Sequence, residues 1–150
     1  MSLIDTVSSA IASFEGYYNP GSVADRNNNP GNLRSWGNRP VRDGFALFDS
    51  PEEGWAALRR QVELNISRGL SLREFFGGKP GVYSGYAPAA DSNDPNRYAE
   101  FVAARAGVPA DIPLAAGSAG VPILSSPSSE DLGVLFVTAA AAVAALVLAS

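Results

Sequence analysis

One acidic residue, Glu15, lies where a helix that packs on a core would place an apolar side chain. Residues 2–15 read SLIDTVSSAIASFE, and their apolar side chains recur at the spacing of a buried helix face: Ile4, Val7, Ile11 and Phe14. At about 100° per residue, Glu15 projects roughly 20–40° from Ile4 and Ile11, on the same face. A carboxyl held against apolar groups is costly to ionise, so we expect the raised pKa that a general acid needs near neutral pH. The alternative is a half-exposed acid at a helix end.

The residues that follow Glu15 cannot form a regular helix or strand. Gly16 can end the helix, and the turn pairs Pro20-Gly21 and Pro30-Gly31 come after it. The stretch from Asn27 to Asn32 is rich in side-chain amides, which both donate and accept hydrogen bonds. Such groups suit a polyhydroxylated, N-acetylated ligand such as a glycan. They equally suit a surface loop whose amides cap its own turns.

The composition removes several kinds of chemistry. The 150-residue chain has no Cys and no His, which excludes disulfides, thiolate nucleophiles, Ser-His-Asp and Cys-His catalysis and the commonest zinc ligand. Carboxylates, Tyr, Lys and Arg remain as reactive groups, and we expect neither a metal nor a cofactor. The net charge of −4 and the lack of a long basic run argue against a nucleic-acid partner.

Capping residues and hydrophobic spacing predict a small, mainly α-helical domain over residues 1–114. Besides the helix at residues 2–15, a short strand at 44–48 is expected to pair with residues 36–41 through the turn Asp43-Gly44. Further helices are expected at residues 51–67, 70–76 and 94–106.

The remaining residues differ sharply in composition. Residues 115–131 are rich in Pro, Gly and Ser and predict a flexible linker. Residues 132–149 carry no charge and would span about 27 Å as a helix, so we predict a single C-terminal transmembrane helix. The alternative is an Ala-rich helix that packs on a partner protein. The N-terminus lacks the basic region and the continuous apolar run of an export signal.

The pattern Phe14-Glu15-Gly16, a short spacer, then NNPGNLR, GFALF and SPEEGW resembles a known family. It is similar to the phage and bacterial lysozyme-like domains related to soluble lytic transglycosylases, in the goose-type lysozyme-like superfamily. The resemblance covers about residues 4–112 and is most specific where Glu15 occurs together with the run Asn28 to Leu33. It implies a mainly α, α+β lysozyme-like fold with a minor β-hairpin and an acid beside a cleft. The implied substrate is the β-1,4 bond between N-acetylmuramic acid and N-acetylglucosamine in peptidoglycan.

The resemblance assigns the catalytic acid to Glu15. In the family's mechanism this carboxyl protonates the glycosidic oxygen and then acts as a base, while the C6 hydroxyl of the sugar replaces water and leaves an anhydro-muramyl end. A water-using inverting hydrolase would need a second carboxylate about 6.5–9.5 Å away. Asp25 and Asp43 are the candidates nearest in sequence. Either can instead cap a turn, which we favour for Asp43 before Gly44.

The resemblance also implies residues that bind substrate. Asn29 and Asn32 align with the cleft wall, and Gly31 between them would let the backbone approach the sugar closely. Tyr86 and Tyr98 fall in a later segment of the family's cleft, where an aromatic stacks on sugar and a tyrosine faces the acid. The alternatives are a loop aromatic that covers the core, for Tyr86, and a packing residue on a helix face, for Tyr98.

We therefore expect a lytic transglycosylase that acts on peptidoglycan glycan strands and is held in a membrane through residues 132–149. A C-terminal anchor without an N-terminal signal would leave a bacterial enzyme on the wrong side of its membrane. A virion protein in the internal membrane of a phage, beside other virion proteins, avoids this problem, and the bacterial cell envelope is the alternative location. The rival functions are a water-using muramidase assisted by Asp25 and a catalytically silent glycan-binding or structural virion protein.

Overall fold

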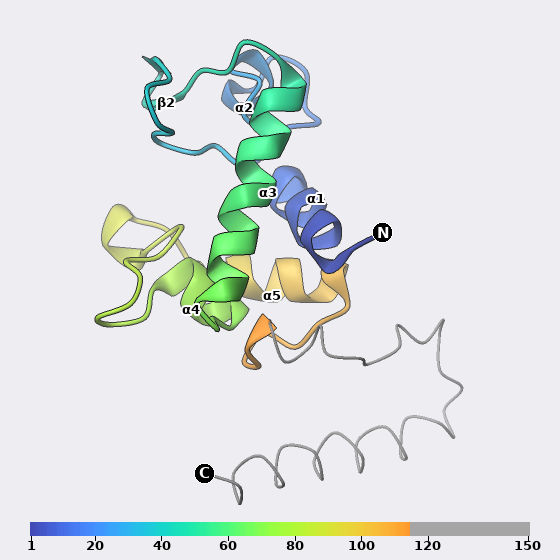
Figure 1. Ribbon diagram of the computed structural model, residues 1–150, viewed down its shortest axis with the longest axis vertical. Helices are drawn as coiled ribbons and strands as arrows, with labels where there is room; N and C mark the ends of the chain where they lie inside the picture. Colours follow the sequence, from blue (N-terminus) through green and yellow to red (C-terminus); the bar gives the residue numbers. More distant parts are fainter. Residues whose placement is uncertain (115–150) are drawn as a thin grey trace, which may run out of the picture.

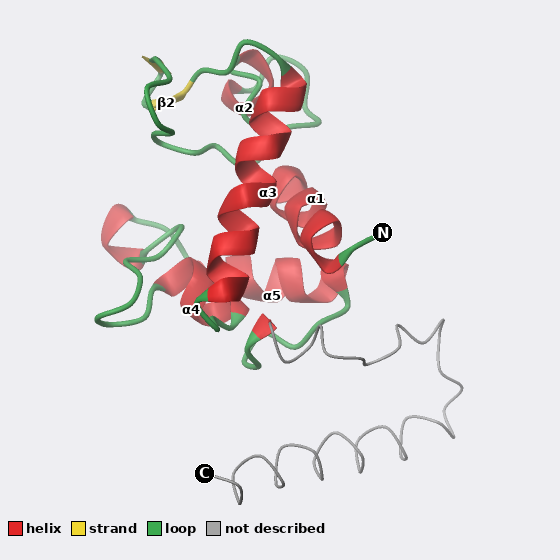
Figure 2. Cartoon of the chain, viewed as in Figure 1, coloured by secondary structure: helices red, strands yellow, loops and turns green. Residues whose placement is uncertain are grey.

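The computed structural model describes residues 1–114 of the chain (Figure 1). The expected linker at 115–131 and the expected membrane helix at 132–149 lie outside the described residues. Within residues 1–114 helices predominate, and one two-stranded antiparallel hairpin accompanies them (Figure 2). The prediction of a mainly α-helical domain with a minor hairpin is confirmed. No helix in this part of the chain is both long enough and apolar enough to cross a membrane.

Helix α1 (Leu3–Phe14) begins at a capping box and ends just before a glycine. The Ser2 hydroxyl accepts the backbone N–H of Asp5 at 3.1 Å, and the Asp5 carboxylate accepts the N–H of Ser2 at 3.3 Å. At the other end Gly16 adopts a φ of 73°, which ends the helix. Glu15 is the C-cap residue between them. The helix ends therefore place Glu15 where the chain leaves α1.

Three further helices complete the helical part of the domain. Helix α3 (Pro51–Ser67) starts after the cap Ser50, α4 (Leu72–Gly77) after Ser71, and α5 (Pro95–Ala106) after Asp94. Helix α1 packs against α3 and α5, and α4 packs against α5. Their shared core is apolar and almost solvent-free, and includes Val7, Ile11, Leu58, Val62, Phe75, Phe76 and Val102. These bounds agree with the predicted helices to within one or two residues at each end.

The segment between α1 and α3 forms a lobe of loops at one end of the molecule (Figure 1). It contains α2 (Val23–Arg26), a single helical turn that is not predicted from the sequence. Strands β1 (Val41–Arg42) and β2 (Phe45–Ala46) pair through Asp43-Gly44, whose φ values of 55° and 83° suit a tight hairpin turn. The hairpin lies where it is expected, but each strand has only two residues because irregular loop flanks the pair.

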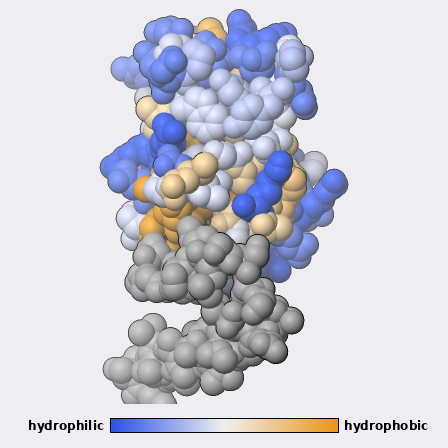
Figure 3. Space-filling model, turned by 90° about the vertical axis from the view of Figure 1, so that its right-hand side faces the viewer, coloured by the Kyte–Doolittle hydropathy of each residue, from blue (hydrophilic) through white to orange (hydrophobic). Residues whose placement is uncertain are grey.

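The loop lobe is fixed on α3 at Gly54. A Cβ atom there would lie 1.8 Å from the carbonyl oxygen of Asn28 and 2.9 Å from Cδ of Pro30. Only glycine therefore lets the loop of residues 27–32, here called the Asn loop, cross the helix this closely. A second small core of Leu33, Ala46, Phe48 and Ala57 lies under the lobe. In Figure 3 polar residues dominate this end of the molecule, whereas apolar residues gather toward the other half.

Candidate active site

The Glu15 carboxyl is half-buried and accepts two hydrogen bonds from distant parts of the chain. The Tyr98 hydroxyl of α5 donates to Oε1 at 2.6 Å. The side-chain amide of Asn32 in the Asn loop donates through Nδ2 to Oε2 at 2.9 Å. Three separate segments, α1, α5 and the Asn loop, therefore meet at this one acid.

Burial raises the pKa of Glu15 above its usual value of 4.5, because desolvation disfavours the charged carboxylate. The hydrogen bonds from Tyr98 and Asn32 act in the opposite direction, since both stabilise the ionised form. Burial is the larger effect. Glu15 therefore keeps its proton to a higher pH than an exposed glutamate. Once the proton has left, the Tyr98 hydroxyl and the Asn32 amide stabilise the carboxylate by hydrogen bonds. A group that first gives a proton and then takes one back needs both properties.

Tyr98 is held rigidly in front of Glu15. Its ring is stacked between Phe14, at a centroid distance of 3.9 Å, and Phe76, at 4.0 Å, and only 3% of the residue is exposed. Burial, followed by the nearby negative charge of Glu15, raises the pKa of Tyr98 well above its usual range. Tyr98 thus acts as a fixed, protonated hydrogen-bond donor. Its contact with substrate stays a prediction.

Asn32 reaches Glu15 because of its backbone conformation. Its φ of 44° lies in the left-handed region, which asparagine tolerates better than most residues. The Oδ1 atom of the same amide is buried and has no hydrogen-bond partner among the described residues. An unpaired buried acceptor is costly, so this oxygen marks a place beside the acid where a donor would be stabilising.

The Asn29 amide makes its hydrogen bonds within the loop lobe. The residue is fully buried, and its Nδ2 donates to the carbonyls of Leu33 and Ala46, both at 2.9 Å. Its Oδ1 accepts the N–H of Leu33 at 2.9 Å. The structure thus engages this amide within the protein rather than bringing it to Glu15, and its contact with substrate stays a prediction. Asn29 holds the Asn loop closed against β2.

Gly31 lies in close contact with protein atoms, and its approach to a sugar stays a prediction. A Cβ at this position would lie 2.6 Å from the Tyr86 hydroxyl and 2.8 Å from Cδ1 of Leu58, so protein atoms already fill the space above the glycine. Gly31 permits close packing within the protein.

Tyr86 connects the helical part to the loop lobe. Its hydroxyl donates a short hydrogen bond to the carbonyl of Gly31, and its ring packs against both hydrophobic cores. The ring centroid lies 6.1 Å from that of Tyr98 in an edge-to-face arrangement. The structure therefore brings Tyr86 close to the site but engages its hydroxyl within the protein, and its stacking on sugar stays a prediction.

Asp25 lies on the single-turn helix α2, and Asp43 lies in the hairpin turn. Asp25 is exposed on α2 and accepts the N–H of Gly21 at 2.8 Å, whereas Asp43 forms an ion pair with Arg26 at 3.2 Å in the hairpin turn. Within residues 1–114 neither aspartate makes a hydrogen bond to Glu15, and no other carboxylate contributes to the Glu15 pKa. The turn-capping alternative thus accounts for the position of both residues.

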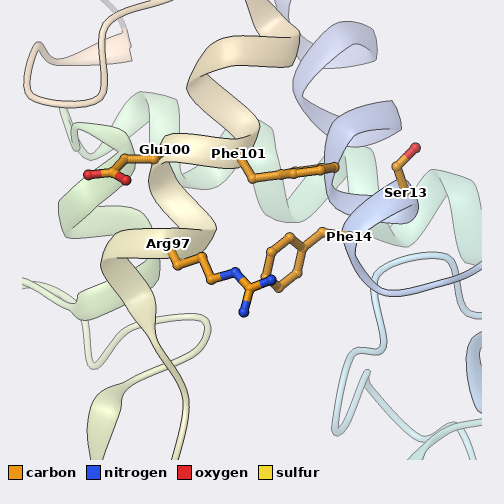
Figure 4. Close-up of a pocket in the computed structure, with 5 residues that line it drawn as sticks. All are labelled: Ser13, Phe14, Arg97, Glu100 and Phe101. Atoms are coloured by element: carbon orange, nitrogen blue, oxygen red, sulfur yellow. The ribbon is translucent and has the colours of Figure 1, made fainter.

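An open depression of about 630 Å³ lies between α1 and α5. It is lined by Ser13, Phe14, Arg97, Glu100 and Phe101 (Figure 4). The Phe14 ring in its lining stacks on Tyr98, so the depression lies one aromatic ring away from the tyrosine that donates to the acid. The sequence does not predict this depression, because its walls come from two helices that are distant in sequence. Across residues 1–114 no group of acidic side chains is arranged to hold a metal ion.

Comparisons of the chain with protein-family models, with curated proteins and with solved structures find no match. The function is therefore inferred from the chemistry of Glu15 and its two donors.

Proposed function

We propose that this protein is a peptidoglycan-cleaving glycosidase of the lytic transglycosylase type, with Glu15 as its single catalytic acid and base. The observation that carries the proposal is the environment of the Glu15 carboxyl. Desolvation raises its pKa, and Tyr98 at 2.6 Å and Asn32 at 2.9 Å are in place to stabilise the carboxylate. The resemblance of the surrounding residues to lysozyme-like domains supplies the substrate class.

The proposed reaction needs no second carboxylate. Protonated Glu15 donates its proton to the glycosidic oxygen as the bond from that oxygen to C1 of N-acetylmuramic acid breaks, which leaves positive charge on the sugar. The resulting carboxylate accepts the proton of the C6 hydroxyl while O6 bonds to C1. The products are a free 4-hydroxyl and a 1,6-anhydro-muramyl end, and no water is consumed.

The surroundings of Asp25 favour this route over a water-using hydrolase. Asp25 is exposed and makes its hydrogen bond to the backbone of Gly21. An inverting hydrolase needs a carboxylate that is held opposite the acid and activates water. Within residues 1–114 Asp25 therefore has no hydrogen bond that holds it toward Glu15 as such a base.

The test is digestion of purified peptidoglycan by the full chain, followed by mass spectrometry of the product ends. Anhydro-muramyl ends are expected with the wild-type protein, and Glu15→Gln should reduce their release by at least about a thousandfold. Reducing ends would indicate a muramidase instead. A wild-type protein that binds peptidoglycan without cleaving it would be the silent glycan-binding module.

We also propose that the domain is attached to a membrane through residues 132–149 and acts as a virion protein of a membrane-containing phage. The support is the uncharged, apolar composition of these residues and the target of the proposed reaction, which lies outside the cytoplasmic membrane of the host. Detergent extraction of purified particles tests the proposal. Release of the full chain together with lipid is expected. Retention in the protein shell after delipidation, or absence from particles, contradicts it.

A further inference from the structure

We propose that the depression between α1 and α5 binds the stem peptide of peptidoglycan and that Arg97 pairs with a carboxylate of that peptide. This inference rests on the proposed function, because it names a second part of the same substrate. The depression is lined by Ser13, Phe14, Arg97, Glu100 and Phe101, and its volume of about 630 Å³ is typical of sites for small ligands.

The position of the depression relative to Glu15 supports the proposal. The Phe14 ring stacks on Tyr98 at a centroid distance of 3.9 Å and meets Phe101 edge-on at 5.2 Å. Tyr98 in turn donates to Glu15. One aromatic ring therefore separates the depression from the tyrosine that holds the acid. The proposal requires that a substituent on the sugar cleaved at Glu15 extends past the Phe14 ring into the depression.

The charge of Arg97 also supports the proposal. The guanidinium of Arg97 is exposed and makes no ion pair or hydrogen bond with any described residue. Nearby Arg73, by contrast, bonds Asp111 at 2.5 Å and pairs with Glu100 at 3.4 Å. Figure 4 shows the Arg97 side chain extending from α5 toward the Phe14 ring on α1. A guanidinium in this position is ready for a carboxylate, which it can bind through two parallel hydrogen bonds.

The mixed apolar and charged lining of the depression supports binding of a peptide as well. Phe14 and Phe101 give the depression apolar walls, and Glu100 adds a largely exposed carboxylate to the rim. A neutral sugar ring carries no ionic group that could pair with either charge. A stem peptide carries carboxylates, an amine and aliphatic segments on one short chain, and is attached to the muramyl residue next to the scissile bond. Its carboxylates can pair with Arg97, and its aliphatic segments can pack on the apolar walls.

The experiment measures binding in the full chain with Glu15→Gln, so that no strand is cleaved. Calorimetric titration uses three kinds of soluble glycan strand: strands with stem peptides, strands with the peptides stripped to leave the lactyl carboxylate, and peptide-bearing strands whose carboxyls are methylamidated. Each is titrated into Glu15→Gln alone and with Arg97→Gln added. Arg60→Gln is the matched control, because it removes the same charge from an exposed arginine paired with Glu63 on α3.

We expect Arg97→Gln to weaken binding of peptide-bearing strands roughly three- to tenfold and to leave methylamidated strands unaffected. Arg60→Gln should change neither. An equal effect on charged and methylamidated strands, or no effect on either, overturns the proposal. Loss of binding only for stripped strands overturns the assignment to the peptide and favours the lactyl carboxylate. Because binding is measured without turnover, failure of the wild-type protein to cleave would count against the proposed function alone.

Discussion

The Tyr98 hydroxyl donates a 2.6 Å hydrogen bond to the Glu15 carboxyl although 83 positions separate the two residues. Neither helix can create this site alone, because α1 supplies the acid and α5 supplies the donor. The stacking of Tyr98 between Phe14 and Phe76 links that donor to the core. Packing of α5 on α1 and α4 therefore assembles the surroundings of the Glu15 carboxyl and fixes the geometry around it.

Tyr98→Phe separates the two functions of this tyrosine. The variant keeps the ring between Phe14 and Phe76 but loses the donor to Glu15, so we expect the cleavage rate to fall at least about tenfold with little change in melting temperature. Tyr98→Ala should destabilise the domain by about 3–5 kcal/mol, because it leaves a cavity in the core.

The control is Tyr83→Phe, which removes a hydroxyl that bonds Gln61 away from the site. Rates and thermal melts of the three variants check the prediction. A Tyr98→Phe variant with wild-type turnover would reduce Tyr98 to a packing residue.

Glu15→Gln should make the domain more stable at neutral pH. Burial gives Glu15 a higher pKa in the folded state than in the unfolded chain, so the folded state binds the proton more tightly. The stabilisation from this site is complete below the unfolded pKa and is lost as the pH rises through the folded pKa. Glutamine does not titrate, so the variant escapes that loss.

The measurement is the difference in melting temperature between Glu15→Gln and wild type from pH 4 to pH 8. The difference should favour the variant at high pH and shrink as the pH falls. The unpaired Oδ1 of Asn32 helps the variant, because a flipped Asn32 amide can accept from the glutamine side chain. A difference that is constant over this range would show that Glu15 titrates normally.

Asn32→Gly should move the pH dependence of cleavage. Glycine accepts the φ of 44° at this position, so the loop can keep its path while the amide is lost. The Asn32 hydrogen bond stabilises the Glu15 carboxylate, and its removal should raise the pKa of Glu15 further. The alkaline limb of the kcat/KM profile, where the acid is lost, therefore shifts to higher pH. Tyr98→Phe should shift it more, because Tyr98 is the stronger of the two donors.

The matched control for this pH shift is Asn28→Gly. Asn28 belongs to the same loop and has a similar φ of 49°, but its amide donates to the Phe48 carbonyl at 3.1 Å rather than to Glu15. Its removal should leave the limb in place. A shift of equal size in both variants would attribute the effect to the loop and not to the Asn32 donor.

The helices and the acid could be predicted because local signals specify them. Ser50-Pro51 and Ser71 are helix caps whose effect depends on the next few residues, and the position of Glu15 on an apolar face follows from helical spacing alone. The roles of Asn29 and Asn32 could not be predicted in the same way. Both flank Pro30-Gly31, yet the Asn29 amide turns into the loop and the Asn32 amide reaches Glu15. The direction of each side chain depends on the path of the backbone through the loop.

The lining of the depression and the aromatic stack on Tyr98 depend on tertiary packing, which no spacing rule records. Phe76 is a clear example: its position in a short helix gives no sign that its ring covers Tyr98. Gly54 is different, since the sequence does contain a signal. Glycine in the first turns of a helix is unfavourable, and such a residue usually marks a close approach of another segment.

Gly54→Ala tests whether this close approach holds the site together. The added Cβ would lie 1.8 Å from the Asn28 carbonyl oxygen, a backbone atom that cannot rotate away, so the Asn loop has to move off α3. We expect the free energy of unfolding to fall by about 1–3 kcal/mol, as in other overpacked contacts. Because Asn32 belongs to the displaced loop, cleavage should also fall, through a longer distance between Asn32 and Glu15.

Gly77→Ala in helix α4 is the matched control, because its Cβ would meet Pro95 at an ordinary 3.6 Å. That variant should be neutral or slightly more stable, since alanine favours the helix over glycine. Thermal melts and cleavage rates of both variants decide the matter. If Gly54→Ala melts like wild type and cleaves normally, the contact between the Asn loop and α3 does not position the active site.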